Sequence, residues 1–288
     1  MKELKRILLV GKYNDTSLKN QVQRIANFLV GMNCKVLIDQ ETKGLLDLNY
    51  PVYTEEMAQA GDLVDAVLAV GGDGTMMGAC RRWGLYGIPL LGVNQGRVGF
   101  LTDLAMDDTL TKLKDILDGK YQTDERFLLE VSVKDNEKIV FQEICLNDVV
   151  LGRGSVSKMN EFTLLINGEF VYSQNADGMI ISTPTGSTAY SSAAGASIMV
   201  PGLEALSICL ICPQNMSNRP IVINANYEIK VLFSGKRDIM FALDGIQPPD
   251  IVVGASVEIK KTDKYITLIH PCDYSYYSGL RSKLNWTA

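Results

Sequence analysis

The chain contains very little histidine, since His270 is the only one in 288 residues. A Ser-His or Cys-His nucleophile needs an imidazole beside the attacking atom, and zinc sites commonly use imidazole as a ligand. The sequence therefore disfavours both chemistries.

A basic excess and a long hydrophobic run are also absent. The net charge is −5 and the pI is near 5.1, which argues against nonspecific binding to nucleic acid or to an acidic membrane. No stretch is apolar for long enough to span a bilayer, and the apolar run within residues 1–10 is too short for a signal peptide. We expect a cytoplasmic globular protein without nucleic-acid or membrane partners.

The cysteines do not form a recognisable framework. They are scattered, mostly in apolar segments, at Cys34, Cys80, Cys145, Cys209, Cys212 and Cys272. This distribution favours reduced, buried thiols. Cys209 and Cys212 have ligand spacing, but they lie in an apolar run that reads as a buried strand, and no second pair accompanies them. We interpret them as structural.

The first part of the chain alternates apolar runs with helical patterns. Residues 5–10, 35–38, 66–70 and 88–93 are predicted strands. A helix is predicted from Thr16 or Ser17 to about Phe28, and another from Asp107 or Asp108 through Leu117. This alternation predicts a Rossmann-like parallel sheet with crossover helices.

After Arg126 the pattern changes to strands separated by turns. The predicted strands are 127–133, 140–150, 162–172, 179–182, 206–212, 228–233 and 239–243. Asn167-Gly168 is the strongest hairpin signal, and residues 135–137 and 235–237 mark two more. The sequence thus predicts an α/β N-terminal domain (1–126) and a β-rich C-terminal domain (127–274). A C-terminal tail, about 275–288, is expected to pack back on the first domain.

Residues 71–75 read Gly-Gly-Asp-Gly-Thr, directly after a buried strand and before a helical pattern. The glycines permit close approach, and the amides at a helix start can donate to phosphate oxygens. Asp73 would repel phosphates, so it needs another role, either holding a divalent cation or taking a proton from a hydroxyl. The alternative is an ordinary glycine-rich exit from a parallel sheet.

A second such turn follows the strand at 179–182. Residues 177–190 are rich in hydroxyls and glycine, and the small side chains of 191–196 let a ligand or a backbone approach closely. The alternative is a tightly packed helix with several capping residues. Two phosphate-type turns, one in each domain, favour a nucleotide and an active site between the domains.

These blocks, together with Asn147-Asp148, resemble the NAD kinase family. Residues 94–103, 217–222 and 243–245 extend the likeness over almost the whole chain, and residues 268–271 and 273–277 resemble its bacterial, Gram-negative branch. The resemblance implies transfer of the ATP γ-phosphoryl group to the adenosine ribose 2′-hydroxyl of NAD, giving NADP. It also implies a divalent cation such as Mg²⁺ and a homodimer or homotetramer.

By this resemblance Asp73 is the general base, and no residue is assigned to the metal. The implied phosphate or ATP loop consists of Gly71, Gly72, Gly74 and Thr75. The implied NAD-binding residues are Asp73, Gly74, Phe100, Asn147, Asp148, Lys158, Asn175, Asp177, Thr188, Ala189, Tyr190, Ser191, Ser192, Ala193 and Gln247. Taken singly, Asn147-Asp148 could be a strand-end cap, Phe100 and Tyr190 could be core, and Lys158 and Gln247 could be exposed loop.

The chain departs from the family pattern at three places. Residues 213–215 lack the Pro-His of many bacterial members. Asn175 stands where relatives can carry a basic residue, which weakens a phosphate contact there. Ala193 stands where some members have a hydroxyl, so one hydrogen bond to ligand is lost.

Other functions remain open at this point. A lipid or sphingoid-base kinase shares the Gly-Gly-Asp-Gly-Thr turn, but it needs an apolar acceptor pocket, and residues 177–190 do not suit an acyl chain. A non-catalytic NAD sensor would bind NAD without needing Asp73. A dehydrogenase is disfavoured because the first strand lacks the Gly-x-Gly-x-x-Gly turn.

Overall fold

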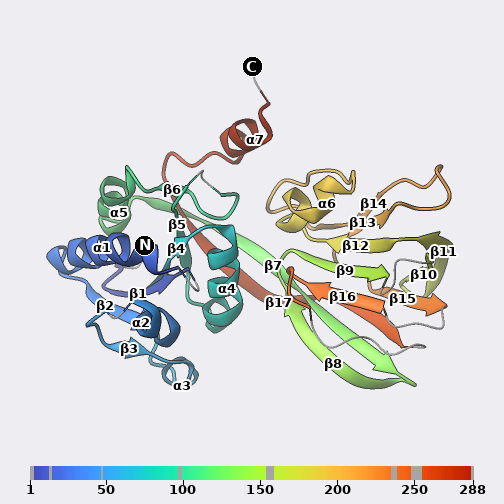
Figure 1. The fold of residues 1–288 in the computed structure, drawn as a ribbon, viewed down its shortest axis with the longest axis horizontal. Coiled ribbons are helices and arrows are strands. Elements are labelled where there is room, and N and C mark those ends of the chain that lie inside the picture. Colours follow the sequence, from blue (N-terminus) through green and yellow to red (C-terminus); the bar gives the residue numbers. More distant parts are fainter. Residues whose placement is uncertain are drawn as a thin grey trace. The chain divides into compact units, whose positions relative to one another are not determined.

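The computed structural model describes residues 3–12, 15–46, 48–96, 99–153, 159–234, 239–247 and 255–286. The chain splits into two compact units (Figure 1). Unit 1 comprises Met1–Glu125 and Tyr265–Ala288, and unit 2 comprises Arg126–Lys264. The chain returns to unit 1 within a long strand, β17 (Ser256–Pro271), and not at about residue 275. No helix among the described residues is both long and apolar enough to cross a membrane.

Unit 1 alternates strands and helices, as the apolar pattern predicts. Its elements are β1 (Arg6–Gly11), α1 (Lys19–Gly31), β2 (Lys35–Asp39), α2 (Gln40–Leu46), β3 (Val52–Tyr53), α3 (Glu55–Gln59), β4 (Ala66–Gly71), α4 (Asp73–Trp83), β5 (Leu90–Asn94), β6 (Leu104–Ala105), α5 (Thr109–Leu117) and α7 (Tyr276–Leu284). Thr16–Leu18 and Gly84–Tyr86 form 3-10 turns. The four predicted strands and both predicted helices are confirmed, with boundaries shifted by a few residues.

The strands of unit 1 form a parallel sheet in the order β3-β2-β1-β4-β5. β4 is buried along its whole length, as expected for a parallel strand with both faces covered. Alternate residues such as Ile7 and Leu9 pack with α1 and α5 in one core cluster, and α4 packs against β4 and β5. The sheet is therefore doubly wound.

The strand order reverses between β1 and β4. From β1 the chain adds strands outward to β3, whereas from β4 it adds β5 on the other side. Open α/β sheets bind ligands at such a switch point, outside the carboxyl ends of the strands. Gly11 ends β1, and Gly71 ends β4 and starts the 71–75 turn. The turn thus lies where the fold favours a ligand.

Unit 2 contains mostly antiparallel strands. Its elements are the second part of β7 (Tyr121–Asp135), then β8 (Lys138–Cys145), β9 (Asp148–Arg153), β10 (Asn160–Ile166), β11 (Glu169–Ala176), β12 (Gly178–Ser182), α6 (Tyr190–Ala193), β13 (Ala205–Ile211), β14 (Ile221–Asn224), β15 (Ile229–Ser234), β16 (Ile239–Leu243) and the first part of β17. Gly186–Thr188 forms a 3-10 turn. The predicted β-rich domain is confirmed.

The strands of unit 2 form two packed layers. One layer has the order β14-β13-β12-β9-β16, and in the other β11-β10-β15-β17 is followed by β7 and β8. Inward residues from both layers, including Leu151, Ile181, Phe162 and Val231, share one core cluster. Along β10 buried residues alternate with partly exposed ones, whereas β12 and β13 are buried over almost all of their length.

Two of the three predicted hairpins are confirmed. Asn167 and Gly168 both have positive φ and join β10 to β11, and Asn136 and Glu137 do the same between β7 and β8. The hairpin predicted at 235–237 lies outside the described residues.

Two predictions about unit 2 are wrong. The strand predicted over 140–150 is interrupted at Leu146 and Asn147, where the backbone bends between β8 and β9. Cys212 is exposed with a φ of 46°, because β13 ends at Ile211. None of the six cysteines, all within the described residues, forms a disulfide, and Cys272 is also exposed.

Candidate functional site

Asp73 is the first residue of α4, and a neighbouring turn holds its carboxylate. Oδ2 accepts a hydrogen bond from the Phe100 amide at 2.8 Å. Oδ1 accepts from the Leu101 amide at 3.1 Å and from the Thr102 hydroxyl at 3.0 Å. The side chain is partly exposed. Three donors from the 99–102 turn therefore set the direction of this carboxylate.

The 99–102 turn is itself held by close packing. The Thr102 hydroxyl accepts from the Asn94 side-chain amide at 2.8 Å and from the Gly99 amide at 3.1 Å. A Cβ at Gly99 would overlap the Asp73 carboxylate. Only glycine fits there, and sequence reasoning placed Gly99 in a family-like segment without finding this role. The Asn-x-Gly-x-x-Gly spacing of residues 94–99 is the signal that was available.

The glycines of the 71–75 turn differ in what surrounds them. A Cβ at Gly71 would overlap the Thr75 side chain, so this glycine and Thr75 pack against each other. Among the residues that the structure describes, none has an atom within 4 Å of a Cβ added at Gly72 or Gly74. Close packing within the protein explains Gly71, whereas the space beside Gly72 and Gly74 is available to a ligand.

A pocket of about 280 Å³ lies beside this turn, at the switch point of the sheet. It is lined by Val10, Gly11, Lys12, Asp39, Glu41, Thr42, Gly74, Thr75, Gly78, Ala79, Arg82 and Trp83. Arg82 makes ion pairs with Asp39, Glu41 and Glu55 at 2.6–3.3 Å. Burial raises the pKa of Asp39. Arg82 is thus paired with three carboxylates, and Lys12 is paired with Asp15. The feature of this pocket that suits an anionic ligand is therefore the start of α4 at Gly74 and Thr75, where backbone amides are available.

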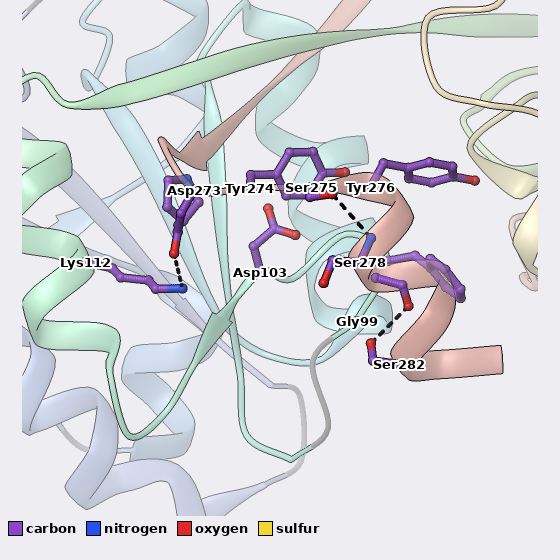
Figure 2. Close-up of a pocket in the computed structure, with 12 residues that line it drawn as sticks. Gly99, Asp103, Lys112, Asp273, Tyr274, Ser275, Tyr276, Ser278 and Ser282 are labelled. Atoms are coloured by element: carbon purple, nitrogen blue, oxygen red, sulfur yellow. Dashed lines mark hydrogen bonds and ion pairs between the residues drawn. The ribbon is translucent and has the colours of Figure 1, made fainter. Parts of the chain in front are cut away.

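Phe100 lies on the same turn, next to the C-terminal helix. Its ring is partly buried, and the Lys283 ammonium of α7 stands 4.9 Å from the ring centroid. Burial lowers the pKa of Lys283. Figure 2 shows the neighbouring pocket of about 300 Å³, where serines and tyrosines of 274–282 line the space beside Gly99 and Asp103.

The only histidine, His270, is buried beside Asp103, the residue that follows the 99–102 turn. His270 is 1% exposed, its Nδ1 is paired with Asp103, its Nε2 lies 3.7 Å from Asp124, and its ring stacks on Tyr274 at 4.0 Å. Burial lowers the pKa of His270, but the two carboxylates outweigh it, and the pKa is raised. The His270 ring therefore ties β17 to the segment that follows the 99–102 turn.

In unit 2, Asn147 and Asp148 lie at the bend between β8 and β9. The Thr183 amide donates to the Asn147 carbonyl at 2.9 Å, and the Thr183 hydroxyl donates to the Leu146 carbonyl at 2.6 Å. A Cβ at Gly186 would overlap the Asn147 carbonyl. The glycine- and threonine-rich block thus packs against the backbone of the Asn-Asp pair.

The two side chains at this bend are unusual. Asn147 Oδ1 is buried and accepts no hydrogen bond within the described part of the chain, a condition that buried polar atoms seldom tolerate. Asp148 is only 5% exposed. Burial, together with the nearby Asp244 carboxylate, raises the pKa of Asp148 to about 7. Asn147 Oδ1 and the Asp148 carboxylate are thus suited to accept hydrogen bonds from a ligand.

Residues 188–193 form a short turn and helix after Gly186. Ser191 is fully buried, and its hydroxyl has no partner among the described residues, whereas the Ser192 hydroxyl donates to the Ala189 carbonyl at 2.8 Å. Tyr190 is 49% exposed, so the core alternative for this residue is wrong. Thr188 and Ala189 are partly exposed and Ala193 is exposed.

Three more of the predicted residues, Asn175, Asp177 and Gln247, lie at or near the ends of strands in unit 2. Asn175 is exposed at the end of β11 and donates to the Gln214 side chain at 3.1 Å. Asp177 precedes β12, and its amide donates to the Ile211 carbonyl at 2.9 Å. Gln247 is exposed after β16. Lys158 lies outside the described residues.

The described residues contain no group of three or more His, Cys, Asp or Glu side chains that could hold a metal ion. They therefore do not build a protein cage for a divalent cation. Mg²⁺ commonly binds through one or two carboxylates together with substrate phosphates.

Known proteins were compared with the whole chain. A family model for the ATP-NAD kinase N-terminal domain matches residues 7–121, and one for the ATP-NAD kinase C-terminal domain matches residues 146–271. The chain belongs to the NAD kinase family. It is thus an enzyme, a kinase, and the two family domains follow the α/β and β-rich parts described above.

Relatives named NAD kinase match over their full length. The proteins from Azotobacter vinelandii and Thiobacillus denitrificans are each 40% identical, covering 99% and 96% of this chain and 97% and 96% of their own. Yeast NADH kinase, solved with NADH, has a TM-score of 0.86 at 21% identity and covers 100% of this chain and 89% of its own. An NAD kinase from Archaeoglobus fulgidus, solved with ATP, has a TM-score of 0.75 at 22% identity, with coverages of 98% and 100%. At these identities the two structures show a shared fold.

Proposed function

We propose that this NAD kinase family member transfers the γ-phosphoryl group of ATP to the 2′-hydroxyl of the adenosine ribose of NAD, with Asp73 as general base. The observation that carries the proposal is the Asp73 carboxylate, fixed by three donors at the start of α4. An ionised carboxylate offers about four lone-pair positions. Oδ1 accepts two of these hydrogen bonds and Oδ2 one, so Oδ2 retains a position for the substrate hydroxyl.

The 2′-oxygen forms a bond to the γ-phosphorus as the bond from that phosphorus to the bridging oxygen breaks, and ADP leaves. The hydroxyl proton passes to Asp73 Oδ2. Phosphoryl transfer asks the protein mainly to align oxygens and balance charge. The 99–102 turn supplies this alignment for the base.

We further propose that Asn147 and Asp148 accept hydrogen bonds from NAD hydroxyls. The partnerless Asn147 Oδ1 and the buried Asp148 carboxyl support this role. The exposed ring of Tyr190 and the buried Ser191 hydroxyl offer an aromatic face and a further polar contact. Phe100, Asp177, Thr188, Ala189, Ser192 and Ala193 remain proposed contacts, and Asn175, Lys158 and Gln247 are the weakest of the set.

For the phosphoryl donor we propose the pocket at the β1–β4 switch point. Its position outside the carboxyl ends of parallel strands, beside the N-terminus of α4, supports an anionic nucleotide there. The family relative solved with ATP supports the choice of ATP. A divalent cation such as Mg²⁺ is expected to arrive with the ATP phosphates.

The test is direct. Purified protein incubated with NAD, ATP and Mg²⁺ should generate a product that an NADP-specific dehydrogenase reduces, and ³¹P NMR should show a 2′-phosphomonoester. Folded protein that makes no such product from NAD, but phosphorylates a sphingoid base or another lipid alcohol, would replace the proposal with the lipid-kinase alternative. The homodimer or homotetramer implied by the resemblance remains a prediction, to be measured by sedimentation.

A further inference from the structure

Asp244, the residue directly after β16, lies at the centre of a group of hydrogen bonds. Its Oδ1 accepts from the Asn147 amide at 2.6 Å and from the Leu146 amide at 3.1 Å, with the Asp148 amide at 3.4 Å. Oδ2 also accepts from the Leu146 amide, at 3.0 Å. The Cys145 thiol donates to Oδ1 at 3.2 Å. One carboxylate thus gathers three consecutive backbone amides.

The backbone at Asp244 and Gly245 forms a defined turn. Asp244 has a φ of 52° and is the first central residue of a tight turn, in which Leu243 and Ile246 exchange backbone hydrogen bonds and an Asp-Gly pair is favoured. Its own amide donates to the Asp148 carbonyl at 3.1 Å. The next residue, Gly245, has a φ of 76°. The bond from Asp244 to Asp148 is therefore reciprocal, and it extends the pairing of β16 with β9.

The bend is held from two directions. Asp244 gathers the amides of 146–148, and Thr183 with Gly186 packs against the carbonyls of Leu146 and Asn147. With its amides and carbonyls occupied in this way, the backbone leaves little freedom for the directions of the Asn147 and Asp148 side chains.

The same carboxylate changes the electrostatics of its neighbour. Asp148 is buried, and the Asp244 charge adds to the burial in raising the pKa of Asp148 to about 7. Cys145 is the other titratable group beside this pair. Burial and Asp244 raise the pKa of its thiol well above the usual range, so it stays neutral. On β12 the residue paired with Asp148 is Ser182, which does not titrate near neutral pH.

We propose that Asp244 is a positioning residue that aims the Asn147–Asp148 pair at the NAD hydroxyls and makes NAD binding dependent on the protonation of Asp148. The proposal rests on the proposed function for the role of that pair. Ligand hydroxyls donate to an ionised carboxylate, so they favour ionised Asp148. NAD binding should therefore release protons, and affinity should fall as pH is lowered through about 7.

Calorimetric titration of NAD into the full-length protein tests this without turnover. For wild type, affinity should fall about tenfold for each pH unit below the midpoint, as for one proton released. Asp244→Asn removes the charge but keeps one acceptor, so the midpoint should move to lower pH. Asp244→Ala leaves the 146–148 amides without their acceptor. It should raise KM for NAD about tenfold or more, with a smaller change in kcat.

A matched control is Glu258→Gln, which removes a carboxylate in unit 2 that pairs with Lys134 and Lys230. It should leave the midpoint and KM unchanged. A midpoint in Asp244→Asn equal to that of wild type, in a variant folded by circular dichroism, would overturn the proposal. If both Asp244 variants unfold, a wild-type affinity for NAD that does not change between pH 5.5 and 8.5, or one whose pH dependence persists in Asp148→Asn, would overturn it. Failure of the proposed function would instead appear as wild-type protein that makes no NADP.

Discussion

The two carboxylates proposed to meet NAD are held in opposite ways. In unit 1 the side chain of Asp73 is fixed by three donors, and it stays partly exposed. In unit 2 the backbone of Asp148 is fixed instead, through Asp244, and its side chain is buried in surroundings that oppose its charge. A base must stay aimed at a reacting hydroxyl, whereas a binding carboxylate gains its favourable charge state when the ligand hydroxyls arrive.

The largest effect is expected from Asp73→Asn. The amide keeps the size of the carboxylate but cannot take a proton, so kcat should fall by about two to four orders of magnitude while NAD still binds. The coupled NADP assay, with calorimetry for binding, measures both. Turnover close to wild type would exclude Asp73 as the base and would favour a different acceptor for the proton.

Gly99→Ala tests whether the turn is what aims Asp73. The added methyl group would overlap the carboxylate, so Asp73 must move, and kcat should fall by about one to two orders of magnitude. Gly96→Ala is the matched control, because the one described atom that its Cβ would meet is Asn94 Oδ1, at 3.9 Å. Equal kcat in both variants would show that the exact direction of Asp73 matters little.

Gly186→Ala is the corresponding change in unit 2. Its methyl group would overlap the Asn147 carbonyl, which should raise KM for NAD and destabilise the fold by about 1–3 kcal/mol. Urea unfolding and the NADP assay measure the two effects. A variant with lower kcat but an unchanged KM would contradict the assignment of this bend to binding.

The smallest effect is expected from the buried histidine. Because the pKa of His270 is raised in the folded protein, its stabilising contribution should be complete below the unfolded pKa and should disappear as pH rises through the folded pKa. The Tm difference between wild type and His270→Gln should therefore narrow as pH rises from 6 to 9. A difference that stays constant over that range would show that the charge of His270 contributes nothing and that only its packing matters.

Local patterns predicted the elements whose burial is uniform or strictly periodic. The all-apolar β4 and the helical repeat of Val22, Ile25, Ala26 and Leu29 in α1 were both found, because each pattern reports directly on the covered face. The bend at Leu146–Asn147 was missed because its cause, the Asp244 carboxylate, lies about a hundred residues away along the chain. No local pattern contains that contact.

The residues of the candidate site likewise divide into those that the sequence pointed to and those that only the structure revealed. The glycine-rich motif identified Asp73, since its residue type and neighbours suggest phosphate and hydroxyl chemistry, and the resemblance to the NAD kinase family supplied Asn147 and Asp148. They did not identify Gly99, Thr102 or Asp244, which act only through contacts with those residues.

The order of residues along this chain thus determined its fold class, its family and the chemical groups available to it, because these follow from apolar periodicity and from short motifs. The tertiary structure alone decided how the Asp73 and Asp148 carboxylates are held and that the pKa of Asp148 is raised. Direction and burial depend on which distant donors, carboxylates and glycines the fold brings to the same place.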